Sequence, residues 1–394
     1  MFDLAAVQSA LRSLNLDGWL LYDFRGLNVL ARRVTQFPED LTASRRWFYW
    51  IPAVGEPHKL VHRIEDSVLD HLPGDRTIYL RWQELEAGVR QRVGGASTIA
   101  MEYSPRNGNP YVSRVDAGTI ELVQSCGPQI VSSGDLVQMF EAAWDDDQWQ
   151  MHLAAEKVTT SAFDLAWKLI ANAVSKAGGV EEVAIQAAIM RHFEAHNCTT
   201  YHPPIVARAE HSGLPHYETG HGSDCRIRGG DLVMIDLWCK LDQPRSVYSD
   251  LTRMGYVGES VPDKYAEVFA VVAAARDAAV RFIETELSAG REVRGWQVDD
   301  AARGVIEKAG YGAAFAHRTG HSIGAEVHGN GANMDNLETH DERRLVPRTC
   351  FSIEPGIYLP EFGIRSEINV FIDAAGKPRV TGGPVQREIL ALLA

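Results

Sequence analysis

Four carboxylates and one histidine in the second half of the chain carry the clearest chemical signal in the sequence. Each carboxylate lies in an apolar, β-rich run, where an isolated ionised carboxylate costs several kcal/mol to bury. Such groups need a cation as partner, and several of them on separate strands favour metal. Oxygen donors together with one imidazole suit two divalent cations. The five residues are Asp236, Asp250, His321, Glu354 and Glu367.

The segments around these residues indicate the elements that would position them. The run LVMID ends in Asp236 after a nearly all-apolar stretch that is typical of a buried strand. The run VYSDLTRMGYVG places Asp250 inside a second strand, which could form a hairpin with the first. Helical patterns precede and follow this hairpin, at residues 152–174, 180–197, 261–287 and 295–312.

The first part of the chain alternates strand and helix patterns. An amphipathic helix with Asp3 at its N-cap opens it. Alternation of this kind predicts an α/β layer domain with its boundary near residue 150. The expected strands are residues 18–23, 45–54, 58–64, 77–82 and 97–103, and the expected helices are residues 84–93 and 113–126.

Length and composition limit the class of protein. The 394 residues exceed the roughly 250 to 300 at which a single core stops growing, so we predict two domains, residues 1–150 and 151–394. The net charge of −13 argues against nucleic-acid binding. No signal-peptide pattern or transmembrane stretch is evident, and five cysteines without paired spacing are typical of a reducing compartment. We therefore expect a cytoplasmic protein with no membrane partner.

The ligand residues and their flanking sequences resemble the pita-bread metallopeptidases, peptidase family M24, which include methionine aminopeptidase, aminopeptidase P and prolidase. All five residue types recur in the family's order, with LPHYET, SDLTR, GHSIG, IEPGIY and RSE around them. The resemblance implies that Asp236 binds one metal ion and that His321 and Glu354 bind the other. Asp250 and Glu367 would bridge the two ions, which suits carboxylates because their two oxygens offer about four lone-pair sites. The loop between Asp236 and Asp250 is longer here than in the family.

The implied architecture is an α/β (α+β) two-domain fold, with an N-terminal α/β creatinase-like domain and a C-terminal pita-bread catalytic domain. Two ions about 3.5 to 4 Å apart would acidify water and polarise a carbonyl, so an amide could be hydrolysed without a serine or cysteine nucleophile. Glu354 is the best candidate for the general base. Manganese suits the oxygen-rich set best, although zinc and cobalt also fit.

Three further histidines and one arginine match the family's catalytic and substrate-contacting positions. The histidines are His216 in LPHYET, His317 in FAHRTGH and His328 in EVHGNG. A neutral imidazole there could bond the scissile carbonyl or pass a proton to the leaving amine, whereas the alternative is an ordinary polar contact. Arg365 would hold a metal-bound carboxylate in place, whereas the alternative is a surface salt bridge.

The resemblance implies cleavage of the Xaa-Pro bond of dipeptides by a homodimer, with aminopeptidase P activity on longer peptides as the alternative. A dipeptidase needs a cation for the substrate carboxylate. Prolidases place an arginine where this chain has His340, with three arginines, Arg343, Arg344 and Arg348, nearby.

The N-terminal domain offers Arg45 and Arg46 as a second source of that cation, whereas the alternative is an edge strand with solvated charges. Methionine aminopeptidase usually lacks so large an N-terminal domain. A creatinase-like C–N hydrolase or a non-catalytic binding protein would be expected to have lost ligand positions, and all five are present.

Overall fold

The computed structural model describes residues 2–222 and 224–394, which form two compact units that divide between Ala142 and Ala143. The predicted boundary near residue 150 lies inside helix α6 (Asp146–Ala177), the first helix of the second unit. Asp145 caps this helix by accepting a hydrogen bond from the Gln148 amide, and Gly178 ends it in the left-handed conformation that glycine favours.

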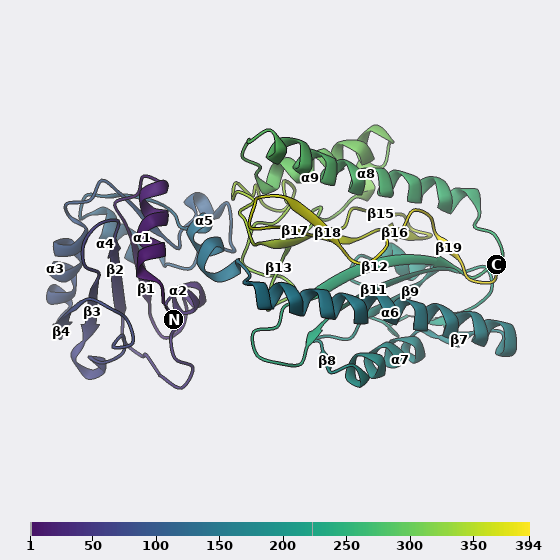
Figure 1. The fold of residues 1–394 in the computed structure, drawn as a ribbon, viewed down its shortest axis with the longest axis horizontal. Helices are drawn as coiled ribbons and strands as arrows, with labels where there is room; N and C mark the ends of the chain where they lie inside the picture. Colours follow the sequence, from purple (N-terminus) through teal and green to yellow (C-terminus); the bar gives the residue numbers. More distant parts are fainter. Residues whose placement is uncertain (1, 223) are drawn as a thin grey trace. The chain divides into compact units, whose positions relative to one another are not determined.

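The first unit is a mixed α/β layer structure around one six-stranded sheet, in the order β4-β3-β2-β1-β5-β6 (Figure 1). Its strands are β1 (Gly18–Asp23), β2 (Trp47–Pro52), β3 (His58–His62), β4 (Asp75–Tyr79), β5 (Thr98–Met101) and β6 (Gln129–Ser132). Its helices are α1 (Leu4–Ser13), α2 (Val29–Val34), α3 (Trp82–Val93), α4 (Ala117–Gln124) and α5 (Gly134–Val137). Short helical turns are η1 (Arg63–Glu65), η2 (Pro105–Asn107) and η3 (Gln138–Ala142).

Strand β1 shows why helices cover both faces of this sheet. Trp19 and Leu21 pack in one apolar cluster with residues of α1 and α2, whereas Leu20 and Tyr22 pack in another with residues of α3 and α4. The two-residue period of a strand sends successive side chains to opposite faces, so an apolar run such as GWLLYD needs cover on both. The α/β layers expected from the sequence are confirmed.

The N-cap predicted at Asp3 is present, and the strand expected at residues 77–82 ends earlier than predicted. Asp3 accepts a hydrogen bond from the Ala6 amide at 3.0 Å, which confirms the predicted N-cap. The expected strand at 77–82 was too long at its end, because Trp82 begins α3, where the Glu84 side chain bonds the backbone amides of Leu80 and Arg81.

The second unit contains four long helices and several short sheets. The helices besides α6 are α7 (Glu182–Ala195), α8 (Asp263–Ser288) and α9 (Gly295–Lys308), with turns η4 (Ala209–Gly213) and η5 (Gly312–Ala314). The first strands are β7 (Val180–Glu181), β8 (Cys198–Thr199), β9 (Ile205–Arg208), β10 (Arg226–Ile227), β11 (Leu232–Leu241) and β12 (Ser249–Tyr256). The later strands are β13 (Ser322–Ile323), β14 (Cys350–Ile353), β15 (Gly356–Tyr358), β16 (Gly363–Arg365), β17 (Ile368–Ile372), β18 (Pro378–Thr381) and β19 (Leu390–Ala391).

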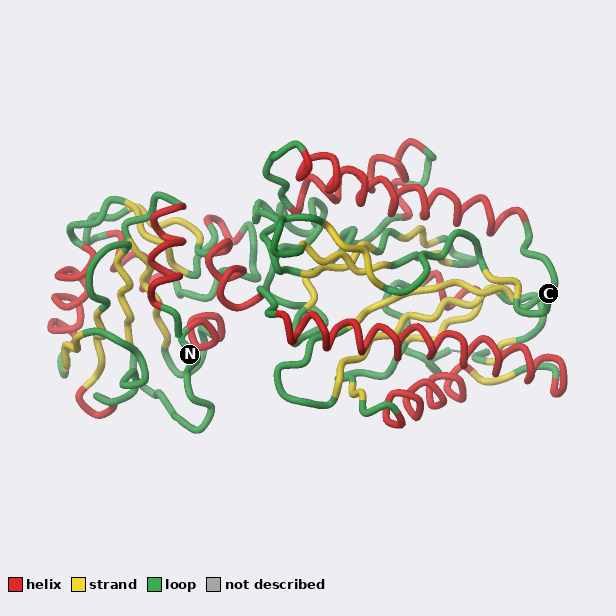
Figure 2. Tube along the Cα trace, in the orientation of Figure 1, coloured by secondary structure: helices red, strands yellow, loops and turns green. Residues whose placement is uncertain are grey.

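The longer strands of the second unit, among them β11, β12, β17 and β18, lie between two helical layers, α6 and α7 on one side and α8 and α9 on the other (Figures 1 and 2). One sheet has the order β19-β12-β11-β8, with β9 also on β11, and a second has the order β13-β14-β17-β18. Val233, Ile235 and Leu237 of β11 pack in the cluster with α6 and α7. Met234 packs in the other large cluster, with α8, α9 and the second sheet. The face of β11 that carries Asp236 is therefore the one turned to the second sheet.

Within the described ranges, no helix combines the length and the apolar character needed to cross a membrane.

Candidate metal centre

The hairpin of β11 and β12 places the two aspartates side by side. Asp236 lies opposite Thr252, and Trp238 lies opposite Asp250, so all four side chains point to one face of the sheet. The intervening β11 residues pack against α6 on the other face. The long loop predicted between the aspartates lies mostly beyond the paired residues, because β11 continues to Leu241 and β12 begins at Ser249.

The second sheet brings the other three residues to one end of its strands. Glu354 follows β14 and Glu367 precedes β17, and these strands are antiparallel with Ile353 opposite Ile368. His321 immediately precedes β13, which pairs with β14. Antiparallel pairing therefore brings residues that lie far apart in sequence together at one end of the strands.

The gathered side chains are close enough to share metal ions. One ligand atom each of Asp250, His321 and Glu367 lies within 4.8 Å of the others. His321 Nε2 lies 3.5 Å from an Asp250 oxygen and 3.2 Å from a Glu354 oxygen. His321 Nδ1 contacts the Ser322 carbonyl at 3.2 Å, which leaves Nε2 to face the carboxylates as in a metal-ligating histidine.

Thr252 links the remaining ligand to this group. Its hydroxyl oxygen lies 2.9 Å from Asp236 Oδ1 and 2.9 Å from Glu367 Oε2. Arg365 Nε donates to the same hydroxyl at 3.0 Å, while Arg365 Nη2 donates to Asp236 Oδ2. All five residues predicted as ligands thus belong to one buried network.

The electrostatics of this network require positive charge. Burial raises the pKa of Glu367 well above its ordinary value, and the nearby Asp250 and Glu354 raise it further. Burial raises the pKa of Asp236 to about 6, against the lowering effect of Arg365. Among the described residues, the buried Glu367 Oε1 has no hydrogen-bond partner. Four carboxylates around one histidine and one arginine, with an orphaned oxygen among them, fit divalent cations.

Arg365 is buried, so the surface salt-bridge alternative for it is wrong. Its Nη1 donates to the Tyr358 oxygen at 2.9 Å, and the Tyr358 hydroxyl lies 2.7 Å from His317 Nε2. His317 Nδ1 donates to the Arg318 carbonyl at 2.7 Å, so the hydroxyl proton of Tyr358 is free to go to Nε2. Burial lowers the pKa of His317 to about 4, which matches this neutral tautomer.

Thr252 and Tyr358 are functional candidates that the sequence alone did not reveal. Both are in motifs that carried the resemblance, SDLTR and IEPGIY, and each is a polar residue within an apolar strand. A polar residue within an apolar strand could have indicated these roles, since a buried hydroxyl needs a hydrogen-bond partner.

The other two predicted histidines also approach the centre. The His328 ring lies 4.3 Å from the His321 ring, centroid to centroid. His321 and burial together lower the pKa of His328 to about 3. His216 lies close enough to His317 and His328 to contribute to the lowered pKa of each, and the Pro215 carbonyl accepts from Arg365 at 3.4 Å.

The nearby alternatives for a carboxylate anchor are engaged with other partners. His340 contacts Asn336 Oδ1 at 2.7 Å and stacks on Trp296. The three arginines each pair with an acidic residue outside the five ligands, namely Arg343 with Asp341, Arg344 with Glu292 and Arg348 with Asp146.

Arg45 and Arg46 belong to the first unit, and their role stays a prediction. Arg45 is exposed, and its amide donates to Glu65 at 2.9 Å. The Arg46 carbonyl accepts from the Tyr79 hydroxyl at 2.7 Å, and the Arg46 charge lowers the pKa of Tyr79 against the raising effect of burial.

An aromatic cluster borders the carboxylates and was not foreseen from the sequence. Trp238 stacks with Tyr201 and with His202 at 6.1 and 6.3 Å between ring centroids, and Tyr201 meets Tyr248 edge-on. Tyr201 is 67% exposed, and Asp250 and Asp236 add to the effect of burial in raising its pKa. These rings lie beside the candidate ligands.

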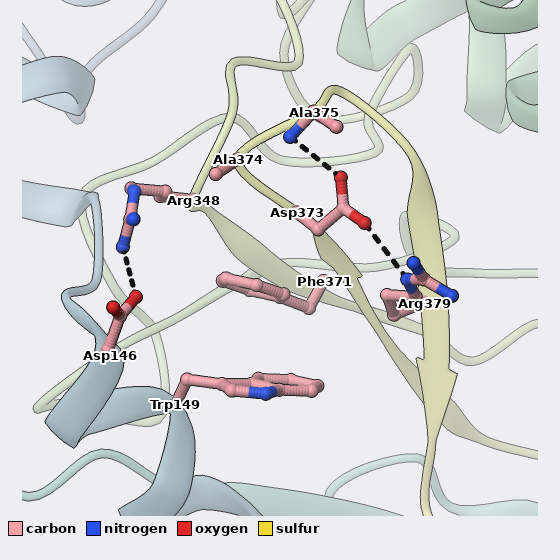
Figure 3. A pocket seen from close by; sticks show the side chains of 8 residues that line it. All are labelled: Asp146, Trp149, Arg348, Phe371, Asp373, Ala374, Ala375 and Arg379. Carbon is pink, nitrogen blue, oxygen red and sulfur yellow. Dashed lines mark hydrogen bonds and ion pairs between the residues drawn. The ribbon is translucent and has the colours of Figure 1, made fainter.

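A separate pocket of about 590 Å³ in the second unit has a different character (Figure 3). Its floor is the stacked pair Trp149 and Phe371, with ring centroids 4.4 Å apart. Two ion pairs flank the rings, Arg348 with Asp146 at 2.8 Å and Arg379 with Asp373 at 2.9 Å (Figure 3). No ligand candidate lines this pocket, and its charges are already balanced.

Comparison with known proteins agrees with this centre. The sequence profile of metallopeptidase family M24 matches residues 150–374, which include all five candidate ligands. The chain belongs to metallopeptidase family M24, as the resemblance predicted. The family implies divalent metal ions.

Among curated proteins, the Xaa-Pro dipeptidase of Pyrococcus furiosus is 36% identical over 187 residues, 47% of this chain and 48% of that protein. The similarity thus spans about half the length of this relative. The crystal structure of dipeptidase PepE from Mycobacterium ulcerans has a TM-score of 0.67 at 23% identity, covering 99% of this chain and 96% of that one. A dipeptidase structure from Pyrococcus horikoshii OT3 has a TM-score of 0.60 at 23% identity, covering 98% and 99%. These likenesses confirm the predicted two-domain fold.

Proposed function

We propose that this protein is a dinuclear metallopeptidase that hydrolyses the Xaa-Pro bond of dipeptides. The observation that carries the proposal is the convergence of five candidate ligands in one connected network with an unpaired Glu367 oxygen. Asp236 would bind one ion, His321 and Glu354 the other, and Asp250 and Glu367 both. The Xaa-Pro dipeptidase named among the relatives supports the substrate class.

Divalent ions at these residues would acidify water and polarise the peptide carbonyl. Glu354 would accept the proton of the attacking water; Ser352 Oγ donates to its Oε1 at 2.9 Å, and Arg365 Nε lies 3.9 Å from its Oε2. Arg365 would keep Asp236 oriented. His317, held neutral by burial, and His216 and His328 would bond the substrate carbonyl or pass a proton to the leaving nitrogen.

We propose Mn²⁺ as the metal, with Zn²⁺ and Co²⁺ as alternatives, because four of the five ligands are hard oxygen donors. The aromatic cluster of Tyr201 and Trp238 would contact apolar parts of the peptide.

We also propose a cytoplasmic homodimer. All five cysteines are free, which fits a reducing compartment. In such a dimer Arg45 and Arg46 of the neighbouring subunit would bind the substrate carboxylate. The nearby arginines of the second unit each pair with an acidic residue already, which favours an anchor from elsewhere.

The test is hydrolysis of Ala-Pro, Ala-Pro-Ala and Ala-Ala by metal-stripped protein, with and without added Mn²⁺, Zn²⁺ or Co²⁺. Metal-dependent cleavage of Ala-Pro alone is the expected result. Preference for Ala-Pro-Ala would make the protein an aminopeptidase P. Absence of cleavage with every metal would favour a creatinase-like C–N hydrolase or a non-catalytic binding protein instead.

A further inference from the structure

A second cluster of ionisable side chains lies at the start of α7, apart from the five ligands. One ligand atom each of Glu182, His211 and Cys225 lies within 4.8 Å of the others. Glu182 is fully buried and His211 is nearly so. Burying a carboxylate costs free energy that hydrogen bonds must offset, so the partners of Glu182 indicate its role.

Hydrogen bonds account for this cluster without an ion. Glu182 Oε1 accepts from His211 Nδ1 at 2.9 Å and from the Arg208 amide at 2.8 Å. Glu182 Oε2 accepts from the Tyr217 hydroxyl at 2.6 Å, and the Tyr217 ring stacks on His211 at 4.5 Å. Both oxygens of Glu182 therefore accept hydrogen bonds from residues of the same unit.

All three donors to Glu182 belong to one stretch of chain. The Arg208 amide ends β9, and His211 and Tyr217 belong to residues 209–222, which we call the His216 loop. Tyr217 is buried, whereas its neighbour His216 is exposed. The bond from Tyr217 to Glu182 consequently fixes the backbone from which His216 projects.

The opposite side of the same loop is tied to the metal centre. The Pro215 carbonyl accepts from Arg365 Nη1 at 3.4 Å. Ser212 Oγ accepts from the Gly363 amide at 2.9 Å, at the start of the strand that ends in Arg365. Residues 215–217 are thus held between the arginine of the centre and the buried carboxylate of α7.

We propose that Glu182 is a positioning residue that acts through Tyr217 to hold the His216 imidazole at the metal centre. This rests on the proposed function of His216. Glu182 lies far from the candidate ligands in sequence, so the sequence alone does not indicate this role. Loss of the bond between Tyr217 and the Glu182 carboxylate would release Tyr217 and let His216 move away, without removing any of the five candidate ligands.

The experiment compares Glu182→Gln and Tyr217→Phe with a control, Glu181→Gln, in Mn²⁺-loaded full-length protein. Glu181 is the adjacent residue and pairs with Arg226 at 3.6 Å, with about half of its side chain exposed. We expect both test variants to lower kcat/KM for Ala-Pro at least about tenfold, because small misplacements of catalytic groups have effects of this size, and the control to match wild type. Manganese content stays at two ions per chain.

Two readouts separate positioning from general destabilisation. Combined with His216→Ala, Glu182→Gln is expected to cause no further loss of kcat/KM, because both changes remove the same contribution. Hydrogen exchange at residues 214–217 is expected to accelerate in Glu182→Gln and in Tyr217→Phe, the variant to use if the first fails to fold.

Additive losses in the double variant, or unchanged exchange at residues 214–217, would overturn the proposal. So would a third ion per wild-type chain that Glu182→Gln removes, since that would make the cluster a metal site. If wild-type protein cleaves none of the peptides, the proposed function fails while the exchange experiment still decides whether Glu182 holds the loop.

Discussion

At the scale of single residues, the candidate centre depends on how four neighbouring carboxylates, three of them buried, are kept from repelling one another. Arg365 and Thr252 together bond or contact Asp236 and Glu367, so the two ends of the ligand set are fixed relative to each other. Partners of this kind orient ligands before a metal arrives, which reduces the reorganisation that binding requires.

Glu354→Gln tests the proposed general base. The amide cannot accept a proton at neutral pH, so we expect kcat for Ala-Pro to fall by about 100-fold or more, the usual range for loss of an acid–base group. Circular dichroism should show an unchanged fold. Glu361→Gln, an exposed glutamate in the next turn of chain, is the control and should behave as wild type. Near-normal turnover in Glu354→Gln would remove Glu354 from the catalytic role.

Tyr358→Phe tests the connection between Arg365 and His317. Removing the hydroxyl takes the bonded partner from His317 Nε2 and one of two acceptors from Arg365 Nη1, and loss of such bonds at a part-buried site costs about 1 kcal/mol. We expect a lower thermal midpoint and a fall in kcat, measured at saturating Mn²⁺. Tyr311→Phe, in a half-buried tyrosine outside this network, is the matched control. Equal kcat in both variants would mean that Tyr358 has no part in positioning His317.

At the scale of elements, the strand that ends in Arg365 is placed by close backbone packing. An added Cβ at Gly363 would lie 1.9 Å from the Ser212 carbonyl oxygen, far inside van der Waals contact. Only glycine therefore lets β16 approach η4, and this approach brings the His216 loop toward Arg365.

Gly363→Ala should separate β16 from η4 and move Arg365. We expect a loss of about 2 kcal/mol or more of unfolding free energy, in the range for overpacking, together with reduced activity. Gly304→Ala is the control, because a Cβ there meets open space on a helix, where alanine is favoured by about 1 kcal/mol. Denaturant unfolding of both variants measures the difference, and an equally stable Gly363→Ala protein would contradict the packing argument.

The first unit contains a histidine that should make it sensitive to acid. Burial, with smaller effects of Arg92 and Lys59, lowers the pKa of His58 to about 4, and its Nε2 lies 2.8 Å from Thr77 Oγ1. Between the ordinary pKa near 6.5 and this value, the folded state binds fewer protons than the unfolded state. The free energy of unfolding therefore falls as the pH drops through this window.

We expect His58 to account for about 1 kcal/mol of that loss, less than the full shift implies because solvent screens part of the effect. Hydrogen exchange of the β2 amides at pH 7.5 and pH 5 measures the change. In His58→Gln the pH dependence should be weaker. An identical pH dependence in the variant would show that other groups cause the loss.

At the scale of the whole molecule, the sequence predicted the parts that rest on short-range patterns. The apolar runs around Asp236 and Asp250 identified the hairpin, and GWLLYD identified the strand at residues 18–23. Contacts between distant segments left no such pattern. The bonds of Glu182 to the His216 loop and the stacking of Tyr201 on Trp238 depend on how elements pack, so only the structure shows them.

The most direct test of the central claim is a titration of metal-stripped protein with Mn²⁺ while hydrolysis of Ala-Pro is followed. The account predicts no turnover without metal and a rise that reaches its plateau at two ions per chain. In Asp236→Asn the plateau should be lost or reached only at much higher Mn²⁺ concentrations. Turnover by the stripped protein, or a plateau unaffected by the loss of Asp236, would contradict a dinuclear centre built from these five residues.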